Sequence, residues 1–308
     1  MSVVERTRVA LSTVRRRRFG GLGRRAAASA PPESFFVGSA IFHYLGPAFA
    51  VLLFALVEPV GVAWLRIAIA AAVFAAWRRP WHAVSRLDPA SRRNVAAMGV
   101  VLGLMNPCFY VAIDRLPLGT VAAIEFLPVV ALAAAGMRTA RNGVALAAAG
   151  GGVYLLSDVS FEAEPAGLAF AFANALLFAL YIVCAHRVAS QSRVAGIDGL
   201  AGAMLVAVVV STPIGLASAL PALVDPVALA AAAGVAVTSS VIPYVFDQLA
   251  MARMPRATYA LLVSLLPATA TLVGVIVLAQ VPSQLELLGV GLVVAGVGLH
   301  RDRPAATA

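Results

Sequence analysis

The chain of 308 residues is 61% hydrophobic and only 12% charged, and its mean hydropathy is +0.93. A soluble domain carries about 25% charged residues, so this composition excludes a protein that is covered by a water-facing surface. The formal net charge of +9 does not indicate a nucleic-acid partner, because residues 1–34 alone hold eight arginines against two glutamates. We therefore predict an integral membrane protein that binds the lipid bilayer and no nucleic acid.

The amino-terminal arm, residues 1–34, contains the run "RRRRFGGLGRR" and few apolar residues. This composition predicts a disordered cytoplasmic arm next to anionic lipid. A twin-arginine export signal is the alternative. A full spanning segment follows the arginines, rather than a short apolar stretch with a cleavage site, which argues against a signal peptide.

Apolar segments of membrane-spanning length follow the arm, since a spanning helix needs roughly 20 mainly apolar residues. Ten segments approach this length, the fifth and tenth being short: 35–56, 60–77, 95–113, 118–137, 143–157, 166–186, 199–220, 227–249, 258–279 and 285–300. The pattern predicts an all-α membrane protein with ten transmembrane helices.

Arginine placement gives an independent prediction of topology. Of the 23 basic residues, 21 lie in the arm, in the loops that follow the even-numbered spans, or in the carboxyl-terminal tail. Arg115 alone lies in an opposite loop, and Arg66 lies inside a span. Because positive charge is retained on the cytoplasmic side, both termini are predicted to be cytoplasmic.

Two similar segments indicate an internal repeat. "AIDRLPLGT" (112–120) and "AMARMPRAT" (250–258) share Ala, Arg, Pro and Thr, and each joins two predicted spans. Chance similarity in an alanine-rich chain is the alternative. The favoured interpretation is two inverted five-helix repeats, 35–157 and 158–300, followed by a cytoplasmic tail, 301–308. Inverted repeats build the two faces of many secondary carriers, so the pattern favours a transporter.

Two charged residues lie inside predicted spans. Arg66 is about six residues into the second span and Glu125 about seven into the fourth, both from the outer side, so both lie roughly 10 Å deep. Charges at this depth are costly and indicate function. They could form a structural ion pair. Alternatively, Arg66 could bind a substrate carboxylate while Glu125 faces an ammonium group or a proton.

Polar side chains also recur at helical spacing on one face of two spans. They are Asn106, Tyr110 and Asp114 in the third span, and Ser240, Tyr244 and either Asp247 or Gln248 in the eighth. The sixth span offers Asn174 and Tyr181. Interhelical hydrogen bonding is the alternative for any one of them, but matching stripes in repeat-related spans favour a shared central cavity.

Prolines inside spans are candidates for helix breaks, because each removes a backbone hydrogen bond. They are Pro107, Pro128, Pro243 and Pro267. Such breaks often border the substrate cavity of a transporter.

These residues resemble a known family. "MNPCFYVAIDRLPLGTVAAIEF" (105–126), "WLRIA" (64–68) and "IPYVFDQLAMARMP" (242–255) are similar to motifs of the EamA-type drug/metabolite transporter superfamily, and within it to the bacterial threonine/homoserine exporters. The similarity covers about residues 40–299. It implies a bacterial inner-membrane protein that exports a small amphipathic metabolite, an amino acid such as threonine or homoserine, by proton exchange.

The chain departs from the family pattern at two carboxylates. Leu266 stands where the family has a Glu before the ninth-span proline, and Gln280 replaces a second Glu near the end of that span. Asp247 stands where the family tends to have Glu. These departures leave open a different cargo, such as a drug or another small metabolite, or a different coupling.

Other classes of function are disfavoured. The four histidines are scattered over different segments and the two cysteines stand apart from one another, so no catalytic or metal-ligating cluster is predicted. We expect no cofactor, no metal and no enzymatic activity. An intramembrane enzyme or a purely structural membrane protein are the remote alternatives, and the oligomeric state is left open.

The predicted topology can be tested with reporter fusions. Fusions after residues 140 and 190 should report a cytoplasmic location, and fusions after residues 160 and 224 an external one, because arginine-rich loops stay inside. A reversed signal at even one of these four sites would contradict the ten-span arrangement.

Overall fold

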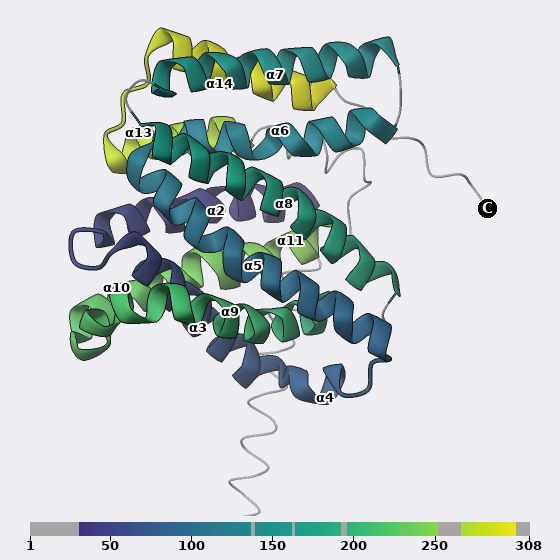
Figure 1. Ribbon diagram of the computed structural model, residues 1–308, viewed down its shortest axis with the longest axis vertical. Helices are drawn as coiled ribbons and strands as arrows, with labels where there is room; N and C mark the ends of the chain where they lie inside the picture. Colours follow the sequence, from purple (N-terminus) through teal and green to yellow (C-terminus); the bar gives the residue numbers. More distant parts are fainter. Residues whose placement is uncertain (1–30, 137–138, 162–163, 192–195, 252–265, 300–308) are drawn as a thin grey trace, which may run out of the picture.

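The computed structural model describes residues 31–136, 139–161, 164–191, 196–251 and 266–299, so the predicted arm and tail lie almost wholly outside the described residues. The described chain is helical, and its helices pack in layers (Figure 1). They are α2 Pro32–Leu53, α3 Pro59–Arg78, α4 Pro80–Val84, α5 Pro89–Arg115, α6 Leu118–Gly136, α7 Ala140–Phe161, α8 Pro165–Gln191, α9 Gly196–Val224, α10 Pro226–Ala236, α11 Ile242–Met251, α13 Leu266–Leu278 and α14 Gln284–Leu299, with a π-helical turn η1, Val237–Val241, between α10 and α11.

Helix starts follow from local sequence. α3, α5 and α10 begin with Pro59, Pro89 and Pro226, where the missing N–H costs nothing because the first helical N–H groups have no internal partner. The side chain of Asp88 accepts the backbone N–H of Ser91, and Asp225 caps α10 in the same way. These caps satisfy donors that would otherwise be unpaired.

Each predicted span overlaps a described helix. Six helical segments are long and apolar enough to cross a bilayer by length and composition, and three shorter apolar stretches fall in α6, α13 and α14. The eighth predicted span consists of α10, η1 and α11, and the ninth is described only from Leu266 onward. The protein is therefore a multi-pass helical membrane protein.

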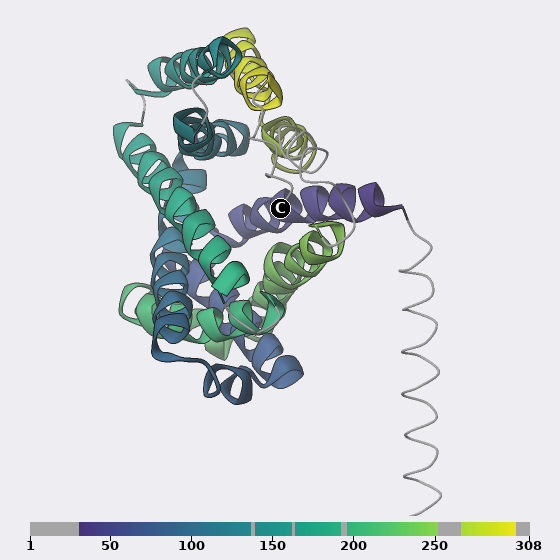
Figure 2. The ribbon, with the colours of Figure 1, turned by 90° about the vertical axis from the view of Figure 1, so that its right-hand side faces the viewer.

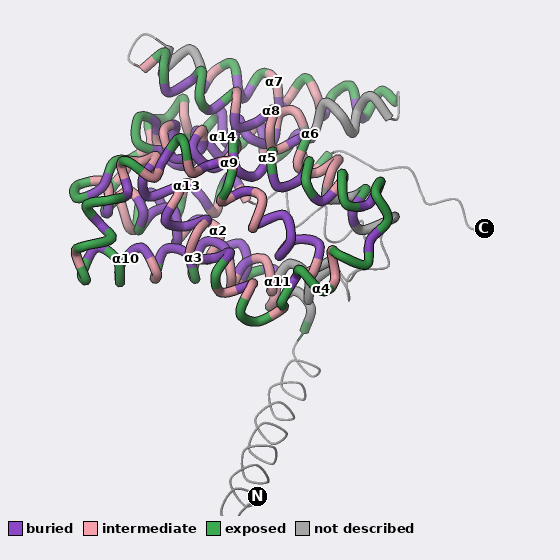
Figure 3. The backbone as a smooth tube through the Cα atoms, turned by 60° about the horizontal axis from the view of Figure 1, so that its bottom comes forward, coloured by how far each residue is buried: buried purple, intermediate pink, exposed green. Residues whose placement is uncertain are grey.

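The outward faces of the helices support the same conclusion. Leu176, Val209 and Ile276 are 64%, 71% and 72% exposed, and exposed residues line the outer faces of the bundle while buried ones gather inside (Figure 3). Apolar surface on this scale is unfavourable in water but is expected where helices face lipid tails.

Small residues bring helices distant in sequence into close contact. On α5, a Cβ on Gly99 would lie 2.5 Å from the carbonyl oxygen of Ala203 on α9, and Gly103 meets Ala207 at 2.9 Å. α7 and α14 pair in the same way, and they lie together at one end of the molecule (Figures 1 and 2). Glycine at these contacts lets the backbones approach, as is typical of helix packing in membranes.

α3 and α9 are joined along their whole length. Gly61 on α3 and Gly215 on α9 allow the close approach. Trp64 Nε1 donates to Thr212 Oγ1 at 3.0 Å in the middle of the contact. At one end Ser218 Oγ donates to Glu58 at 2.5 Å, and at the other Arg78 pairs with Asp198 at 2.7 Å.

Two apolar clusters form the interior. The main core draws residues from most helices and includes Tyr44, Leu65, Phe109, Tyr110 and Ile124. The second core lies between α3, α5, α8 and α9 and includes Ile67, Phe74, Leu102 and Met204. Leu65 and Ile67 flank Arg66, and Leu102 and Phe109 flank Asn106. The polar residues of these helices therefore lie at the boundary between the two cores.

Substitution of Gly215 tests the close packing of α3 and α9. In Gly215→Ala the new methyl group would overlap the carbonyl oxygen of Val60, so we expect a loss of about 1–3 kcal/mol of stability, the usual cost of overpacking. The measurement is the melting temperature of the purified protein in detergent.

Gly291→Ala is the matched control, because a Cβ on Gly291 meets nothing within 4 Å. Replacing a glycine in a helix with alanine should leave stability unchanged or raise it by about 0.5–1 kcal/mol. Equal effects of the two substitutions would contradict the packing analysis.

Candidate functional site

Arg66 is a buried charge held by three neutral partners. It lies in the middle of α3 and is 7% exposed. Its Nε donates to Ser240 Oγ at 2.8 Å, one terminal nitrogen donates to Asn106 Oδ1 at 2.7 Å, and the other donates to the carbonyl oxygen of Ser239 at 2.9 Å. Three segments, α3, α5 and η1, therefore meet at one guanidinium group.

A break in the eighth predicted span supplies the carbonyl group. In an α-helix the carbonyl of Ser239 would accept the N–H of residue 243, but Pro243 has none. The chain forms a π-helical turn here, in which the N–H of Ile242 reaches Val237. Such turns are common at functional sites. The carbonyl oxygen of Ser239 is thus available to Arg66.

Glycine on α2 permits this arrangement. A Cβ on Gly46 would overlap the side chain of Ser239 and lie 2.7 Å from its backbone nitrogen. Ser39 on the same helix donates to the carbonyl oxygen of Pro243 at 3.2 Å. α2 therefore packs directly on the turn that holds Arg66.

The side chain of Asn106 has a defined orientation. Its Nδ2 donates to the carbonyl oxygen of Leu102 at 2.9 Å, so its Oδ1 faces Arg66. Tyr110, one turn further along α5, places its ring 5.6 Å from the guanidinium carbon of Arg66, within the range of a cation–π contact. Asn106 and Tyr110 thus lie together, as predicted, while Asp114 is exposed at the end of α5.

Glu125 does not pair with Arg66. The ion pairs among the described residues, counted within 4.0 Å, are Arg78 with Asp198 and Arg115 with Glu164. Instead, Asn174 Nδ2 on α8 donates to Glu125 Oε1 at 3.1 Å. Arg66 is close enough for its charge to act on Glu125. The simple ion pair considered from the sequence is therefore absent, and each of the two charged groups has neutral partners instead.

The remaining predicted residues fall into separate places. Tyr181 and Tyr244 are half-buried and pack against the second core, and the Tyr181 ring stacks on Phe178 at 6.2 Å. Asp247 lies in α11, but its side chain falls outside what the structure describes.

The predicted helix breaks differ in their effect. Pro107 and Pro128 lie inside the continuous helices α5 and α6. Pro243 accompanies the π-helical turn, and Pro267 is the second residue of the described part of α13. Only Pro243 is therefore tied to the Arg66 contacts.

Sequence reasoning placed Ser240 and Asn174 among the polar residues of the spans, but it did not select Ser239. A signal existed for Ser239, because a proline four residues later leaves its carbonyl without a helical donor. Ser240 was named on the polar face of the eighth span and Asn174 in the sixth, but nothing in their spacing identified Arg66 and Glu125 as their partners.

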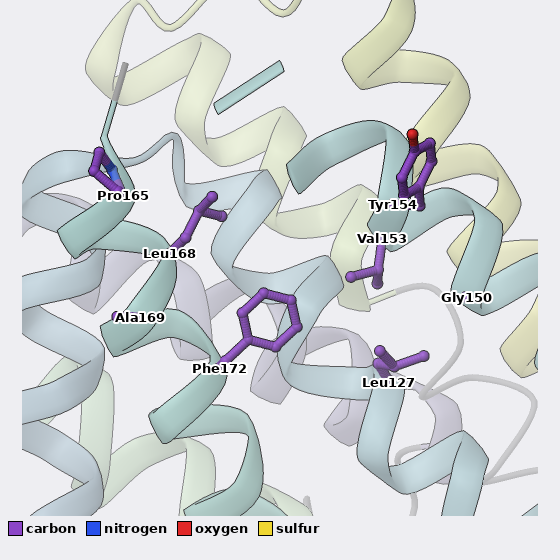
Figure 4. Close-up of a pocket in the computed structure, with 8 residues that line it drawn as sticks. All are labelled: Leu127, Gly150, Val153, Tyr154, Pro165, Leu168, Ala169 and Phe172. Atoms are coloured by element: carbon purple, nitrogen blue, oxygen red, sulfur yellow. The ribbon is translucent and has the colours of Figure 1, made fainter. Parts of the chain in front are cut away.

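A groove lies apart from the polar residues around Arg66 and Glu125. Its volume is about 510 Å³, and it lies between α6, α7 and α8 and is lined by apolar residues and one tyrosine. Figure 4 shows the Phe172 and Leu168 side chains of α8 and the Leu127 side chain of α6 around it. None of the polar cluster lines this groove, and its apolar lining suits a lipid chain better than a charged cargo.

The buried arrangement offers recognition rather than covalent chemistry. Arg66 presents N–H donors, while Glu125 and Asn174 present oxygen acceptors, inside the helix bundle. Arg66 is 7% and Glu125 8% exposed, whereas Ile124 next to Glu125 is fully buried. Opposite charges held apart inside a helical membrane protein are typical of a pathway for a polar solute.

These features define a multi-pass membrane transporter, and comparison with known proteins identifies the family. The EamA-like transporter family matches residues 165–300. The threonine/homoserine exporter RhtA of Escherichia coli K12 is 32% identical over 258 residues, which cover 81% of this chain and 84% of that protein. The exporter of the same name from Salmonella typhimurium LT2 is 30% identical over 254 residues, with the same coverage. The chain belongs to the EamA-like transporter family of the drug/metabolite transporter superfamily.

A solved structure supports the fold. One crystal structure superposes with a TM-score of 0.57 over 87% of this chain and 97% of that chain, at 20% identity. At this identity the likeness concerns the fold alone.

Substitution of Arg66 by lysine tests the role of its three contacts. A single ammonium group cannot reproduce the planar fork of donors, so in Arg66→Lys at least one buried acceptor loses its partner. We expect a loss of about 2 kcal/mol or more, measured as a lower melting temperature in detergent.

Arg78→Lys, on the same helix, is the control. Its ion pair with Asp198 is part-exposed, and such pairs contribute about 0–1 kcal/mol. A larger effect at Arg78 than at Arg66 would be inconsistent with the network described here.

Proposed function

We propose that this protein is a secondary transporter of the bacterial inner membrane that exports a small amino acid resembling threonine or homoserine in exchange for protons. The observation that carries the proposal is the pair of buried polar groups at Arg66, where α3, α5 and η1 meet, and at Glu125, where α6 and α8 meet. The relatives that match over four-fifths of the chain bear the name of threonine/homoserine exporters.

The architecture that accompanies this function is ten spans in two inverted five-helix repeats, 35–157 and 158–300. The helix contacts support it, because a contact between a helix of one repeat and a helix of the other has an equivalent contact in which the two repeats are interchanged. α5 packs on α8 as α11 packs on α2, and α6 packs on α8 as α13 packs on α2. The contacts α3–α9, α6–α13 and α7–α14 join equivalent helices. A pseudo-twofold axis in the membrane plane would produce this pattern.

The orientation follows from the arginine distribution. With both termini cytoplasmic, the arm 1–34 and the tail 301–308 lie inside, and the basic loop between α3 and α5 faces the anionic lipid of the inner leaflet. The polar cluster then lies within the bilayer, where a carrier binds its cargo.

Glu125 is the proposed site of exchange with protons or with the cargo. The family carboxylates replaced in this chain do not weaken that role. Gln280 Oε1 accepts the backbone N–H of Leu118 at 3.2 Å and so caps the start of α6. Leu118 is seven residues from Glu125, roughly 10 Å along the helix. Leu266 packs against the main core. Both positions serve structure in this chain.

Uptake into inverted membrane vesicles tests the function. Radiolabelled threonine and homoserine should accumulate when the vesicle interior is acidified, about tenfold or more above vesicles that carry Arg66→Leu, because the cytoplasmic face is then outermost and proton efflux drives cargo inward. A protonophore should abolish the accumulation.

Two results would each contradict a different part of the proposal, one the coupling to protons and the other the cargo. Accumulation that survives the protonophore would exclude proton exchange. Absence of accumulation for both amino acids, with uptake of a drug, nucleoside or sugar derivative from the same panel, would assign a different cargo to the transporter.

A further inference from the structure

Two buried polar atoms near the charged residues have no hydrogen-bond partner within the described part of the chain. They are the hydroxyl oxygen of Tyr110 and Oδ1 of Asn174. Tyr110 and Asn174 are both fully buried. An unpaired buried polar atom is destabilising, and native proteins retain few of them without a reason. Both belong to residues that contact one of the two charged side chains.

The orientation of Asn174 is fixed by chemistry. A carboxylate only accepts hydrogen bonds, so the amide must turn its NH₂ group toward Glu125, as its 3.1 Å contact with Oε1 requires. Its Oδ1 therefore points away from that hydrogen bond and remains unpaired. The Glu125–Asn174 pair thus offers three acceptor oxygens, two on the carboxylate and one on the amide, against the one amide N–H that the bond to Glu125 leaves free.

The Arg66 side of the cluster has the opposite character. A guanidinium group carries five N–H donors, and three of them are engaged by Asn106, Ser239 and Ser240. The hydroxyl of Tyr110 lies near Arg66 and Ser239 without a hydrogen bond of standard geometry. This side therefore offers donors, two N–H groups and one O–H group, to an acceptor such as a carboxylate.

We propose that Glu125 and Asn174 form the subsite for the ammonium group of the cargo, with Asn174 as a specificity-determining residue, and that Arg66 and Tyr110 receive its carboxylate. The proposal rests on the proposed function and goes beyond it by fixing which end of the amino acid each residue meets. An ammonium group brings three donors and a positive charge, which matches a pair that carries a carboxylate and a free amide oxygen. A hydroxyl group in the same place brings one donor and no charge.

Equilibrium binding to the purified full-length protein tests this without a proton gradient. The ligands are threonine, threoninol, which keeps the ammonium group and lacks the carboxylate, and 2,3-dihydroxybutyrate, which keeps the carboxylate and has a hydroxyl in place of the ammonium group. The wild-type protein should bind threonine at least about tenfold more tightly than 2,3-dihydroxybutyrate.

Two variants locate the discrimination. In Glu125→Gln and in Asn174→Leu, both nearly isosteric, the preference for threonine over 2,3-dihydroxybutyrate should fall to about twofold or less. The preference for threonine over threoninol should persist, because Arg66 and Tyr110 are unchanged. Glu164→Gln, which alters an exposed carboxylate paired with Arg115 at 3.5 Å, should keep both preferences.

The outcomes separate this inference from the proposed function. Equal wild-type affinity for threonine and 2,3-dihydroxybutyrate overturns the ammonium subsite while leaving amino-acid transport intact, and this comparison needs no variant to fold. A full preference retained in a folded Glu125→Gln or Asn174→Leu protein also overturns it. If wild-type protein binds neither threonine nor homoserine, the cargo in the proposed function fails, and the subsite fails with it.

Discussion

The burial of one guanidinium group governs the arrangement of the helices. A charge inside a membrane protein is tolerated when its hydrogen bonds are satisfied, and Arg66 obtains three acceptors from two other segments. Each contact constrains a neighbour: α5 must present Asn106, and the eighth predicted span must open its backbone at Ser239. The π-helical turn, Pro243 and the close approach of α2 at Gly46 together make these contacts possible.

Close packing at small residues lets the helices approach closely enough to supply the hydrogen bonds of Arg66. Glycines at Gly61, Gly99, Gly103 and Gly215 let α3 and α5 lie directly against α9, so the polar side chains of α3 and α5 reach one another across short distances. The apolar residues then separate into a main and a second core on either side of the polar layer. Dispersion and close packing hold the helices where lipid provides no hydrophobic drive.

The sequence was sufficient to predict where the helices lie but not which residues surround the buried charges, and the reasons are physical. Hydropathy and arginine placement report on each segment's environment, so the positions of the helices were predictable, and Asn106 with Tyr110 followed from their spacing on one face. The partner of a buried charge depends on the three-dimensional meeting of distant segments. For that reason Arg66 and Glu125 could be located, while Ser239, Ser240 and Asn174 as their partners could not. α4 was missed because five residues carry no periodic signal.

The separation of Arg66 from Glu125 is itself informative about function. A direct ion pair would satisfy both charges mutually and leave little binding capacity for anything else. In this chain neutral groups hold each charge: serine, asparagine and a backbone carbonyl for Arg66, and the Asn174 amide for Glu125. Neutral partners position a charge without cancelling it, so each retains its attraction for an opposite charge. A site built in this way suits a solute that carries both charges on one small molecule, and it stays polar after the solute has left.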